Sequence, residues 1–311
     1  MYKLFTGLQP SGALHIGNYF GALKPAVEMC REYDGMLMVA DYHALTTLKD
    51  PKAMHENILG VVKDYVAAGL DPEHTIIFKQ SDVPEHTELA WIFQCLVTVP
   101  FLELSHAYKD KLAKGLEANA GLFAYPMLMA ADILLYDTDV VPVGEDQRQH
   151  LEYAREAAAK FNNTFGETFK EPREKILKSV AVVPGTDGKK MSKSYSNTIP
   201  LFGTKDEITK AVMSIVTDSK GELPENVLAI HRAFKSEKEL GALYEANKKN
   251  YKVIKEALIA DVEAIVAPMR DKRDSISDAD AKGILKDGGD RARERASKKM
   301  ADVRKKIGVS I

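Results

Sequence analysis

The feature that most constrains the fold is an alternation of short apolar segments with amphipathic segments over the first half of the chain. Four segments have the length and composition of strands, and they cover residues 3–8, 35–40, 75–79 and 139–143. Helical patterns lie between and after them, near residues 17–33, 51–68, 84–97 and 146–161. Such alternation is typical of a parallel sheet with helices on both faces, which binds ligands at the carboxyl ends of its strands.

The pattern changes after about residue 197. Apolar residues then recur at three- and four-residue spacing in the segments 205–216, 238–246, 251–266 and 292–307, and β-like runs become scarce. A stretch with two glycines, residues 183–188, separates the regions and is typical of a mobile loop. We therefore expect an α/β protein: a Rossmann-like parallel-sheet domain over residues 1–197 and a smaller all-helical domain over residues 198–311. The last helix of the second domain could pack back on the first.

Composition excludes several classes of protein. Hydrophobic residues make up 45% of the chain and charged residues 28%, as in an ordinary globular protein. No apolar run approaches the roughly 20 residues that cross a bilayer, and the first residues lack a leader pattern, so we expect a cytoplasmic protein without a membrane partner. Cys30 and Cys95 are the only cysteines and form no CxxC motif, so no cysteine-based metal site is expected.

The net charge of −2 does not indicate a nucleic-acid partner, but the charge is unevenly distributed. Residues 291–306 contain eight lysines and arginines against only Glu294 and Asp302. A basic stripe of this kind can follow a phosphate backbone. The alternative is a solvated C-terminal helix, and the stripe alone does not decide between them.

A first motif lies where the first predicted strand ends. Residues 7–18 read GLQPSGALHIGN, a glycine- and proline-containing turn that leads into a helix near Gly17. A helix N-terminus presents free N–H groups and a partial positive charge to a phosphate. Gly17 would let a base or ribose lie against the backbone, and His15 could donate to a phosphate oxygen. An ordinary strand–turn–helix remains the alternative.

A second motif, residues 188–194, reads GKKMSKS. Lys190 and Lys193 stand three residues apart among serine hydroxyls, which suits the negative charge of a departing pyrophosphate. The GxxxxGK[ST] spacing of a Walker A loop is missing. In isolation, a solvated basic loop is the alternative.

Together the two motifs resemble the HIGH and KMSKS signatures of class I aminoacyl-tRNA synthetases, in the order that this family requires. Residues 190–194 match KMSKS letter for letter. Residues 15–18 read HIGN, which departs from HIGH at Asn18, a residue that is still a hydrogen-bond donor.

Three further segments resemble tryptophanyl-tRNA synthetases within class I. They are residues 41–44 (DYHA), residues 125–132 (YPMLMAAD) and residues 143–147 (VGEDQ). The resemblance covers nearly the whole chain, from Phe5 to the C-terminal helices, and is most specific between residues 121 and 149.

The resemblance implies a binding site for L-tryptophan. Indole is a flat hydrophobe with one N–H donor and no acceptor, so its pocket needs apolar walls and one buried acceptor. On the family pattern Asp132 is the acceptor, and the alternative is a structural hydrogen bond or helix cap. The implied apolar walls are Phe5, Met129, Ile133, Val141 and Val143, and His43 lies beside the ring. Tyr125 and Gln147 would hold the ammonium and carboxylate of the substrate, and Gln9 would contact the bound amino acid or adenylate. Without the resemblance, the apolar residues would be assigned to the core and His43 to a structural role.

The resemblance also implies ATP as a substrate, with Mg²⁺ bound to the ATP and no metal site on the protein. His15 and Asn18 would stabilise the phosphates, and Lys190 and Lys193 the leaving pyrophosphate. The implied ATP site comprises Gln9, Ser11, Gly17, Asn18, Lys111, Gly144, Asp146, Gln147, Lys190, Met191, Ser192, Lys193 and Ser194.

The family carries out two steps, the formation of tryptophanyl-adenylate and its transfer to tRNA(Trp). It also implies a homodimer, a helical region that binds the tRNA, including its anticodon, and no DNA partner. The near alternative is a tyrosyl-tRNA synthetase, whose pocket must satisfy a phenol that both donates and accepts. A second alternative is a synthetase-like protein without catalysis that senses tryptophan or binds RNA, but such proteins usually have degraded signatures, whereas His15, Gly17, Lys190 and Lys193 are intact.

Overall fold

The computed structural model describes residues 2–115, 117–143, 148–176, 183–217 and 223–310. Five parallel strands form one sheet in the order β3-β2-β1-β4-β5. The chain therefore builds outward from β1 through β2 to β3, and then returns to the other side of β1 with β4 and β5. The boundary between β1 and β4 is the topological switch point, where an open parallel sheet binds its ligands. The strands are β1 (Lys3–Leu8), β2 (Asp34–Val39), β3 (Ile76–Lys79), β4 (Val140–Val143) and β5 (Arg173–Ile176).

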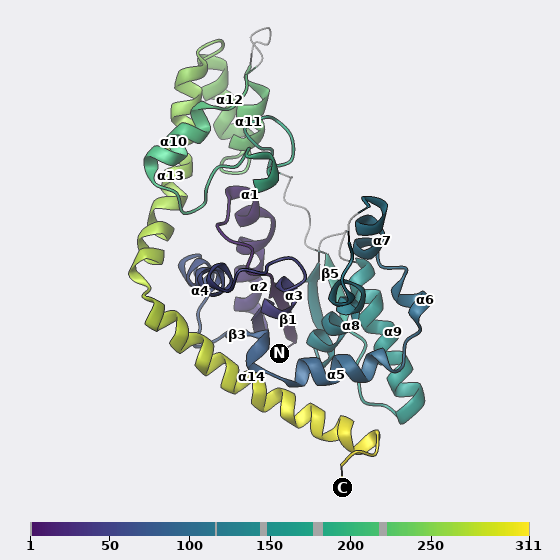
Figure 1. Ribbon diagram of the computed structural model, residues 1–311. Helices are drawn as coiled ribbons and strands as arrows, with labels where there is room; N and C mark the ends of the chain where they lie inside the picture. The colour runs from purple at the N-terminus through teal and green to yellow at the C-terminus, as the bar shows by residue number, and fades with distance from the viewer. Residues whose placement is uncertain (1, 116, 144–147, 177–182, 218–222, 311) are drawn as a thin grey trace.

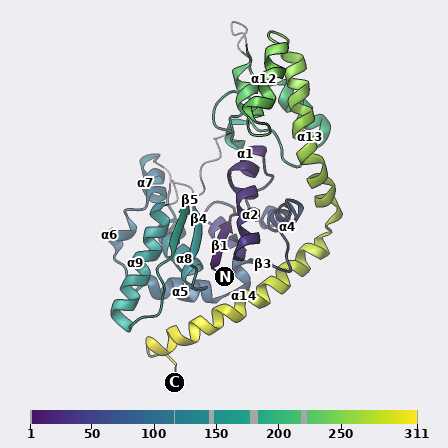
Figure 2. The same ribbon diagram turned by 180° about the vertical axis from the view of Figure 1, so that it is seen from behind.

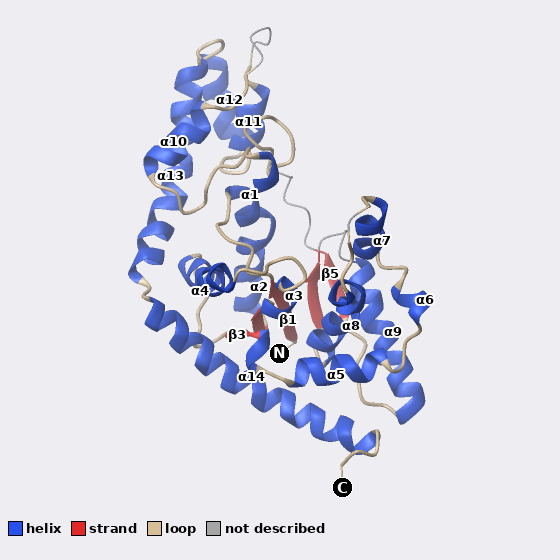
Figure 3. Ribbon diagram, in the orientation of Figure 1, coloured by secondary structure: helices blue, strands red, loops and turns tan. Residues whose placement is uncertain are grey.

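Helices enclose the sheet on both faces (Figure 3). In the first half of the chain they are α1 (Ile16–Asn18), the π-helical turn η1 (Tyr19–Leu23), α2 (Lys24–Glu32), α3 (Asp41–Ala44), α4 (Pro51–Ala67), the 3₁₀ turn η2 (Gln80–Asp82), α5 (Glu85–Gln94), α6 (Val99–Leu102), α7 (His106–Ala113), α8 (Ala120–Leu134) and α9 (Arg148–Phe165). After them come the 3₁₀ turn η4 (Lys193–Tyr195), α10 (Lys205–Met213), α11 (Glu225–His231), α12 (Glu237–Ala246), α13 (Tyr251–Ser275) and α14 (Asp278–Lys306). No described helix combines the length and the apolar composition needed to cross a membrane.

Alternation along the strands divides the core into two clusters. Leu4 and Leu37 point to the face covered by α2 and α4, and their cluster continues into the helices α10–α13. Phe5 and Met38 point to the opposite face, which α5, α8, α9 and α14 cover. Neighbouring residues of a strand face opposite sides, so strands buried on both faces read as continuous apolar runs, as the sequence pattern predicted.

The helices α10–α13 stand together at one end of the molecule, while α14 leaves them and runs along the sheet (Figures 1 and 2). It packs on α4, on the edge strand β3 and on α5. Its apolar face joins the second core cluster through Ala292, Ala296, Met300 and Val303. The division into domains at residue 197 remains a prediction, and α14, which lies beyond that boundary, packs on the sheet edge.

The helix predicted over 292–307 begins at Asp278 in the structure, fourteen residues earlier. The first half of α14 was not predicted because it contains glycines, and glycine disfavours a helix. Gly288 nevertheless has a reason to be there: a Cβ at this position would collide with the carbonyl of Ile77 in β3. The glycine lets the helix backbone lie directly against the sheet edge, which would otherwise be open.

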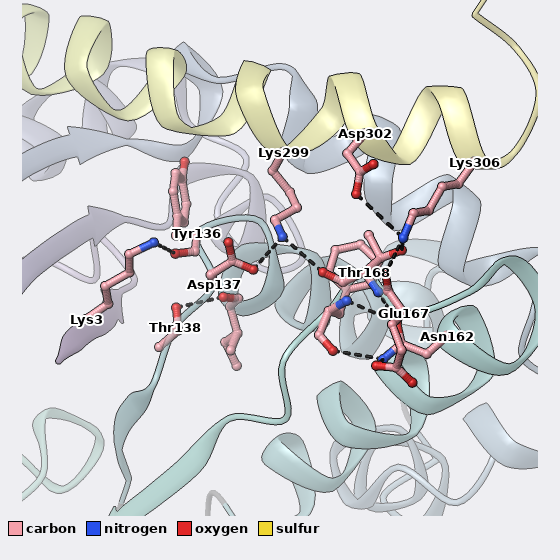
Figure 4. A network of polar contacts seen from close by, with 12 residues as sticks. Lys3, Tyr136, Asp137, Thr138, Asn162, Glu167, Thr168, Lys299, Asp302 and Lys306 are labelled. Carbon is pink, nitrogen blue, oxygen red and sulfur yellow. Dashed lines mark hydrogen bonds and ion pairs between the residues drawn. The ribbon is translucent and has the colours of Figure 1, made fainter.

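Polar contacts hold the end of α14 to the segments around β4 and α9 (Figure 4). The Lys299 ammonium lies 2.5 Å from the Asp137 carboxylate and donates to the Thr168 carbonyl at 3.0 Å. Lys306 donates to the carbonyl of Glu167 and, at 2.8 Å, to the hydroxyl of Thr168.

Strand β5 and helix α8 are among the elements that were not predicted. The strand β5 has the sequence REKI, whose charged residues give no strand pattern. The helix α8 contains Pro126 in its interior and is apolar nearly all round, so its sequence shows no amphipathic periodicity. Neither element could be predicted, because contacts with other elements stabilise it: β5 extends the sheet beside β4, and α8 is packed between α5 and α9.

Candidate active site

A cavity of about 560 Å³ lies at the switch point between β1 and β4, bounded by β2, α3, α7 and α8. The described residues predicted to hold an amino acid meet here. Those that line the cavity are Phe5, Gln9, His43, Tyr125, Met129, Asp132, Ile133 and Val141. Val143 ends β4, but its side chain lies outside the described part of the chain, as does all of Gln147.

Asp132 contributes a carboxylate to this cavity from α8, and only 2% of the residue is exposed. The carboxylate is not unpaired. One oxygen, Oδ2, lies 2.8 Å from His43 Nε2, and the other, Oδ1, accepts from Gln80 Nε2 at 2.8 Å. His86 Nδ1 is 2.6 Å from Oδ1, although it lies off the line of a regular hydrogen bond. Burial alone would raise the pKa of Asp132, but the bond from His43 and the charge of His86 lower the pKa to about 2.

His43 stands at the end of β2, in the short helix α3, and its position determines its tautomer. Because Asp132 is ionised, Nε2 of His43 carries the proton and donates it to the carboxylate. The backbone N–H of His43 points to Gln80 Oε1 at 3.4 Å, and its ring packs edge-on to Tyr125 at 6.2 Å between centroids. The imidazole therefore forms a fixed wall of the cavity, in the place where the sequence predicted a residue beside the ligand ring.

A second hollow of about 240 Å³ adjoins the first, and Gln9 and Thr47 line both. Its other walls include Ser11 and Asn57, and the Asn57 amide donates to the carbonyl of Pro10 at 3.2 Å. The two hollows therefore connect the apolar cavity with the turn that follows β1. This turn carries the first signature.

His15 caps α1 through a reciprocal pair of bonds. Its Nδ1 accepts from the backbone N–H of Asn18 at 3.2 Å, and its own N–H donates to Asn18 Oδ1 at 3.1 Å. Burial and, to a smaller extent, the charge of Lys193 lower the pKa of His15 to about 4. The imidazole is therefore neutral near pH 7, and because Nδ1 is an acceptor, its proton resides on Nε2.

The absence of a side chain at Gly17 leaves room for the ring of His15. A Cβ at this position would lie 3.0 Å from His15 Nδ1, 3.1 Å from His15 Cε1 and 3.5 Å from Met191 Cβ. The glycine thus brings the buried Met191 of the second signature against the first. Contact of Gly17 with adenosine remains a prediction.

The second signature is tied to the first turn by Lys193. Its ammonium donates to the carbonyl of Ser11 at 2.8 Å. Burial lowers the pKa of Lys193, and the negative charge of Asp64 acts in the opposite direction. Lys190, by contrast, is exposed, and within the described residues its ammonium has no hydrogen bond or ion pair. A backbone bond from the Ile16 N–H to the Ile199 carbonyl, 3.0 Å long, and a bridge between His15 and Pro200 hold the segment after the loop beside α1.

Asn197 organises this loop and was not predicted to belong to the site. Only 2% of the residue is exposed. Its Oδ1 accepts from the Ser192 N–H at 2.8 Å, and its Nδ2 donates to Asp187 Oδ1 at 2.7 Å and to the Lys190 carbonyl at 3.1 Å. In the sequence it lies three residues after the signature. An asparagine that satisfies backbone groups gives no periodic signal, so its partners emerge only in the structure.

The matches with known proteins agree with this geometry. A family model described as class I tRNA synthetases for W and Y matches residues 1–281. A tryptophan–tRNA ligase of Fusobacterium nucleatum is 46% identical over 99% of this chain and 98% of its own length. One from Rhodopirellula baltica is 44% identical over 99% of both chains. The crystal structure of tryptophanyl-tRNA synthetase from Campylobacter jejuni, complexed with ADP and tryptophan, superposes with a TM-score of 0.92 at 42% identity, covering 98% of this chain and 99% of that one.

The chain belongs to the tryptophanyl-tRNA synthetases of class I. It is an aminoacyl-tRNA ligase, as the two signatures predicted, and its parallel sheet is the Rossmann-like fold expected for this synthetase.

The remaining predicted residues of the synthetase divide into two groups. Lys111 lies on α7, one turn after Ala107, which lines the larger cavity, so both residues share one face of the helix. Gly144 and Asp146 lie outside the described residues. Across the described ranges, no three histidine, cysteine, aspartate or glutamate side chains lie close enough together to hold a metal ion.

The basic stripe of the synthetase is largely paired within the chain. Arg295 binds Asp34 of β2 through two bonds of 2.9 and 3.1 Å, and Arg304 binds Glu88 of α5 through two bonds, the longer 2.7 Å. Further ion pairs within the chain involve Arg291, Arg293, Lys298, Lys299 and Lys306. The stripe is therefore neither free of partners nor simply solvated, because Arg295 and Arg304 attach α14 to β2 and α5.

Proposed function

We propose that this synthetase activates L-tryptophan with ATP and then transfers it to tRNA(Trp). The observation that carries the proposal is the apolar cavity at the switch point, which contains one buried ionised carboxylate and opens toward the paired signatures. In the first step a carboxylate oxygen of tryptophan attacks the α-phosphorus of ATP. The bond from this phosphorus to the bridging oxygen breaks, and pyrophosphate leaves. In the second step a terminal ribose hydroxyl of the tRNA attacks the acyl carbon, and AMP leaves.

The cavity suits indole by shape and polarity. Phe5, Met129, Ile133 and Val141 supply apolar walls, and Val143 extends this set in the sequence. Asp132 accepts the indole N–H. Tyr125 and Gln147 hold the ammonium and carboxylate of the substrate, Gln9 contacts the bound amino acid or adenylate, and His43 packs beside the ring.

Tyrosine is the nearest competitor. Its phenol needs an acceptor and a donor at the same depth, whereas an ionised Asp132 can only accept. A buried hydroxyl oxygen without a donor costs binding free energy, about 1–3 kcal/mol. The curated relatives at 46% and 44% identity are tryptophan–tRNA ligases, which supports the same choice.

The first signature binds the phosphates of ATP. His15 offers Nε2–H as a neutral donor, because Nδ1 is already used in capping α1. Asn18 lies at the same helix N-terminus and stabilises the phosphates together with His15. Catalysis here needs no nucleophile on the protein; it consists of positioning and charge stabilisation.

The second signature binds the leaving pyrophosphate. Lys193 is already fixed to the first turn, and the exposed Lys190 moves onto the phosphates when ATP is bound. Ser11, Gly17, Lys111, Gly144, Asp146, Met191, Ser192 and Ser194 complete the proposed ATP site.

Magnesium enters with ATP. The described residues offer no carboxylate cluster for a resident ion, whereas Mg²⁺ prefers phosphate oxygens and water with few protein ligands. Bound in this way, the ion neutralises phosphate charge, while the protein groups named above orient the reacting atoms.

The helices α10–α13 bind the tRNA, including its anticodon, since α14 is committed to the sheet. We place the enzyme in the cytoplasm, with cell fractionation as the test.

It functions as a homodimer through the surface of α5–α7, where apolar side chains are exposed: Trp91 is 67% exposed, Val99 60%, and Leu104 and Leu112 51% each. Exposed apolar clusters of this kind mark interaction sites.

The dimer is tested with Trp91→Glu, which places a charge in this surface. Light scattering should give twice the chain mass for the unchanged protein and the chain mass for the variant, at equal melting temperatures. A monomer before substitution, or a dimer that survives it, contradicts this interface.

The catalytic proposal is tested by amino-acid-dependent ATP–pyrophosphate exchange with tryptophan, tyrosine and no amino acid. We expect exchange with tryptophan alone. Asp132→Asn should lower kcat/KM for tryptophan about 10- to 100-fold, because one acceptor oxygen of the carboxylate is replaced by an NH₂ donor. Exchange with tyrosine instead would overturn the specificity, and no exchange in a folded sample would favour the tryptophan sensor.

A further inference from the structure

Two buried polar side chains contact the Asp132 carboxylate without lining the cavity. Gln80, in η2 directly after β3, and His86, in the first turn of α5, are both fully inaccessible to solvent. Neither of them borders the space that the amino acid would occupy. Buried polar groups are costly unless they are bonded, so their bonds show what each of them does.

The amide of Gln80 is held in one orientation. Its Nε2 donates to Asp132 Oδ1 at 2.8 Å, and its Oε1 faces the backbone N–H of His43 at 3.4 Å. A flipped amide would place an oxygen against the carboxylate and an NH₂ against an N–H, both of which repel. Gln80 is therefore a donor to Oδ1.

The proton of His86 is located by its two neighbours. Nδ1 lies 2.6 Å from Asp132 Oδ1, a distance at which two unprotonated acceptors in a dry site would repel, so Nδ1 carries a proton. On the other side, Nε2 lies 2.8 Å from the hydroxyl of Tyr136. Phe78 stacks on the His86 ring at 6.0 Å between centroids and fixes its plane.

These contacts leave little free acceptor capacity on Asp132. A carboxylate oxygen has two lone pairs. Oδ1 accepts from Gln80 and has His86 Nδ1 at 2.6 Å, off the line of a regular hydrogen bond, while Oδ2 has only the bond from His43. The less occupied oxygen is therefore Oδ2, which is bonded to the cavity-lining His43.

We propose that His86 and Gln80 are positioning residues which together occupy the space around Oδ1 of Asp132, so that the pocket presents a single acceptor, on Oδ2, to the substrate ring. They make the site selective for a ring that donates one hydrogen bond and accepts none. The inference rests on the proposed role of Asp132 toward indole, and it adds two residues that determine specificity from outside the pocket.

The test compares tryptophan with β-(3-benzothienyl)alanine, in which sulfur replaces the indole N–H. The ratio of their kcat/KM values in pyrophosphate exchange measures the hydrogen bond to Asp132 and cancels general damage to the fold. His86→Leu and Gln80→Met should each lower this ratio about tenfold, the loss of one well-placed bond. His86→Asn should retain the ratio, because its amide nitrogen takes the place of Nδ1.

The chain offers a matched control in its helical end. His231 is also fully buried and lies between a carboxylate, Asp261 Oδ2 at 2.8 Å, and a tyrosine hydroxyl, that of Tyr244 at 3.1 Å. His231→Leu removes the same kind of network far from the cavity. It should lower the melting temperature as His86→Leu does, while the substrate ratio stays unchanged.

The outcomes distinguish the proposed role of Asp132 from the proposed roles of His86 and Gln80. If Asp132→Asn leaves the ratio unchanged, the proposed role of Asp132 fails, and the inference with it. If Asp132→Asn lowers the ratio but His86→Leu and Gln80→Met weaken both substrates equally, Asp132 keeps its role, and His86 and Gln80 are merely structural. An Asn substitution as harmful as Leu at position 86 would refute the contact through Nδ1. Should His86→Leu fail to fold, Gln80→Met and His86→Asn decide the question.

Discussion

Replacing Asn197 with alanine should disable the second signature without unfolding the protein. The substitution removes three hydrogen bonds, with partners on Ser192, Asp187 and Lys190, from a residue that is 2% exposed. At about 1 kcal/mol net for each bond, the ordered loop loses about 3 kcal/mol, or about a hundredfold in its equilibrium against open forms. The backbone bond from Thr186 N–H to the Asn197 carbonyl, 2.9 Å long, is retained.

Two measurements check this prediction for Asn197→Ala. In pyrophosphate exchange, kcat should fall by up to about a hundredfold while the KM for tryptophan stays within about twofold, since the loop is remote from the amino-acid cavity. Trypsin should cleave faster after Lys189, Lys190 and Lys193, because cleavage follows the population of the open form.

Asn162 provides the matched control. Its Oδ1 accepts from the N–H groups of Thr168 and Phe169 at 2.9 and 3.0 Å, and its Nδ2 donates to the Phe169 carbonyl at 2.8 Å, between α9 and β5. Asn162→Ala should lower the melting temperature and leave kcat and KM unchanged. If the two variants behave alike, either both active or both impaired, the argument that Asn197 acts through the signature loop is refuted.

Two further predictions concern stability and protonation. Gly288→Ala places a methyl group against the carbonyl of Ile77, and this overpacking should cost about 2 kcal/mol and lower the melting temperature by several degrees. Gly283→Ala in the same helix meets open space and should stabilise the protein by about 1 kcal/mol. Equal shifts of the two melting temperatures in calorimetry would contradict the packing of α14. The pKa of His15 is about 4 in the folded protein against 6.5 unfolded, so the unfolded chain binds more protons between these values and the stability owed to His15 rises with pH through this window, complete above pH 6.5 and lost toward pH 4. A proton NMR titration should place its midpoint near 4 and move it upward in Lys193→Ala, whose charge no longer opposes protonation; a midpoint near 6.5 would show that the ring is solvated.

The two signatures could be recognised in the sequence because each of them is contiguous. His15 and Asn18 are three residues apart and cap the same helix turn, so their bonds are local. The four predicted strands agree with β1–β4 to within one residue at nearly every end, since burial on both faces leaves an apolar run that is visible in the chain.

Partnerships across long separations could not be predicted. Asp132 was expected to need a ligand or a partner, and its partners Gln80 and His86 lie 52 and 46 residues away on other elements. Arg295 belonged to a stripe that looked free to bind nucleic acid, yet its carboxylate partner, Asp34, is 261 residues distant. Charge pairing depends on which side chains the fold brings within about 4 Å, and no local pattern records that.

The sequence alone therefore determined the class of fold and the family, because periodicity and short motifs are properties of neighbouring residues; which residues meet the substrates stays a prediction. Only the tertiary structure decided which side chains surround the carboxylate of Asp132, why Gly288 interrupts a helix-forming segment, and what neutralises the basic residues of α14. Each of these is a contact between segments that the chain holds far apart. Packing and desolvation, which set the free energies of such contacts, exist only once the segments have been brought together.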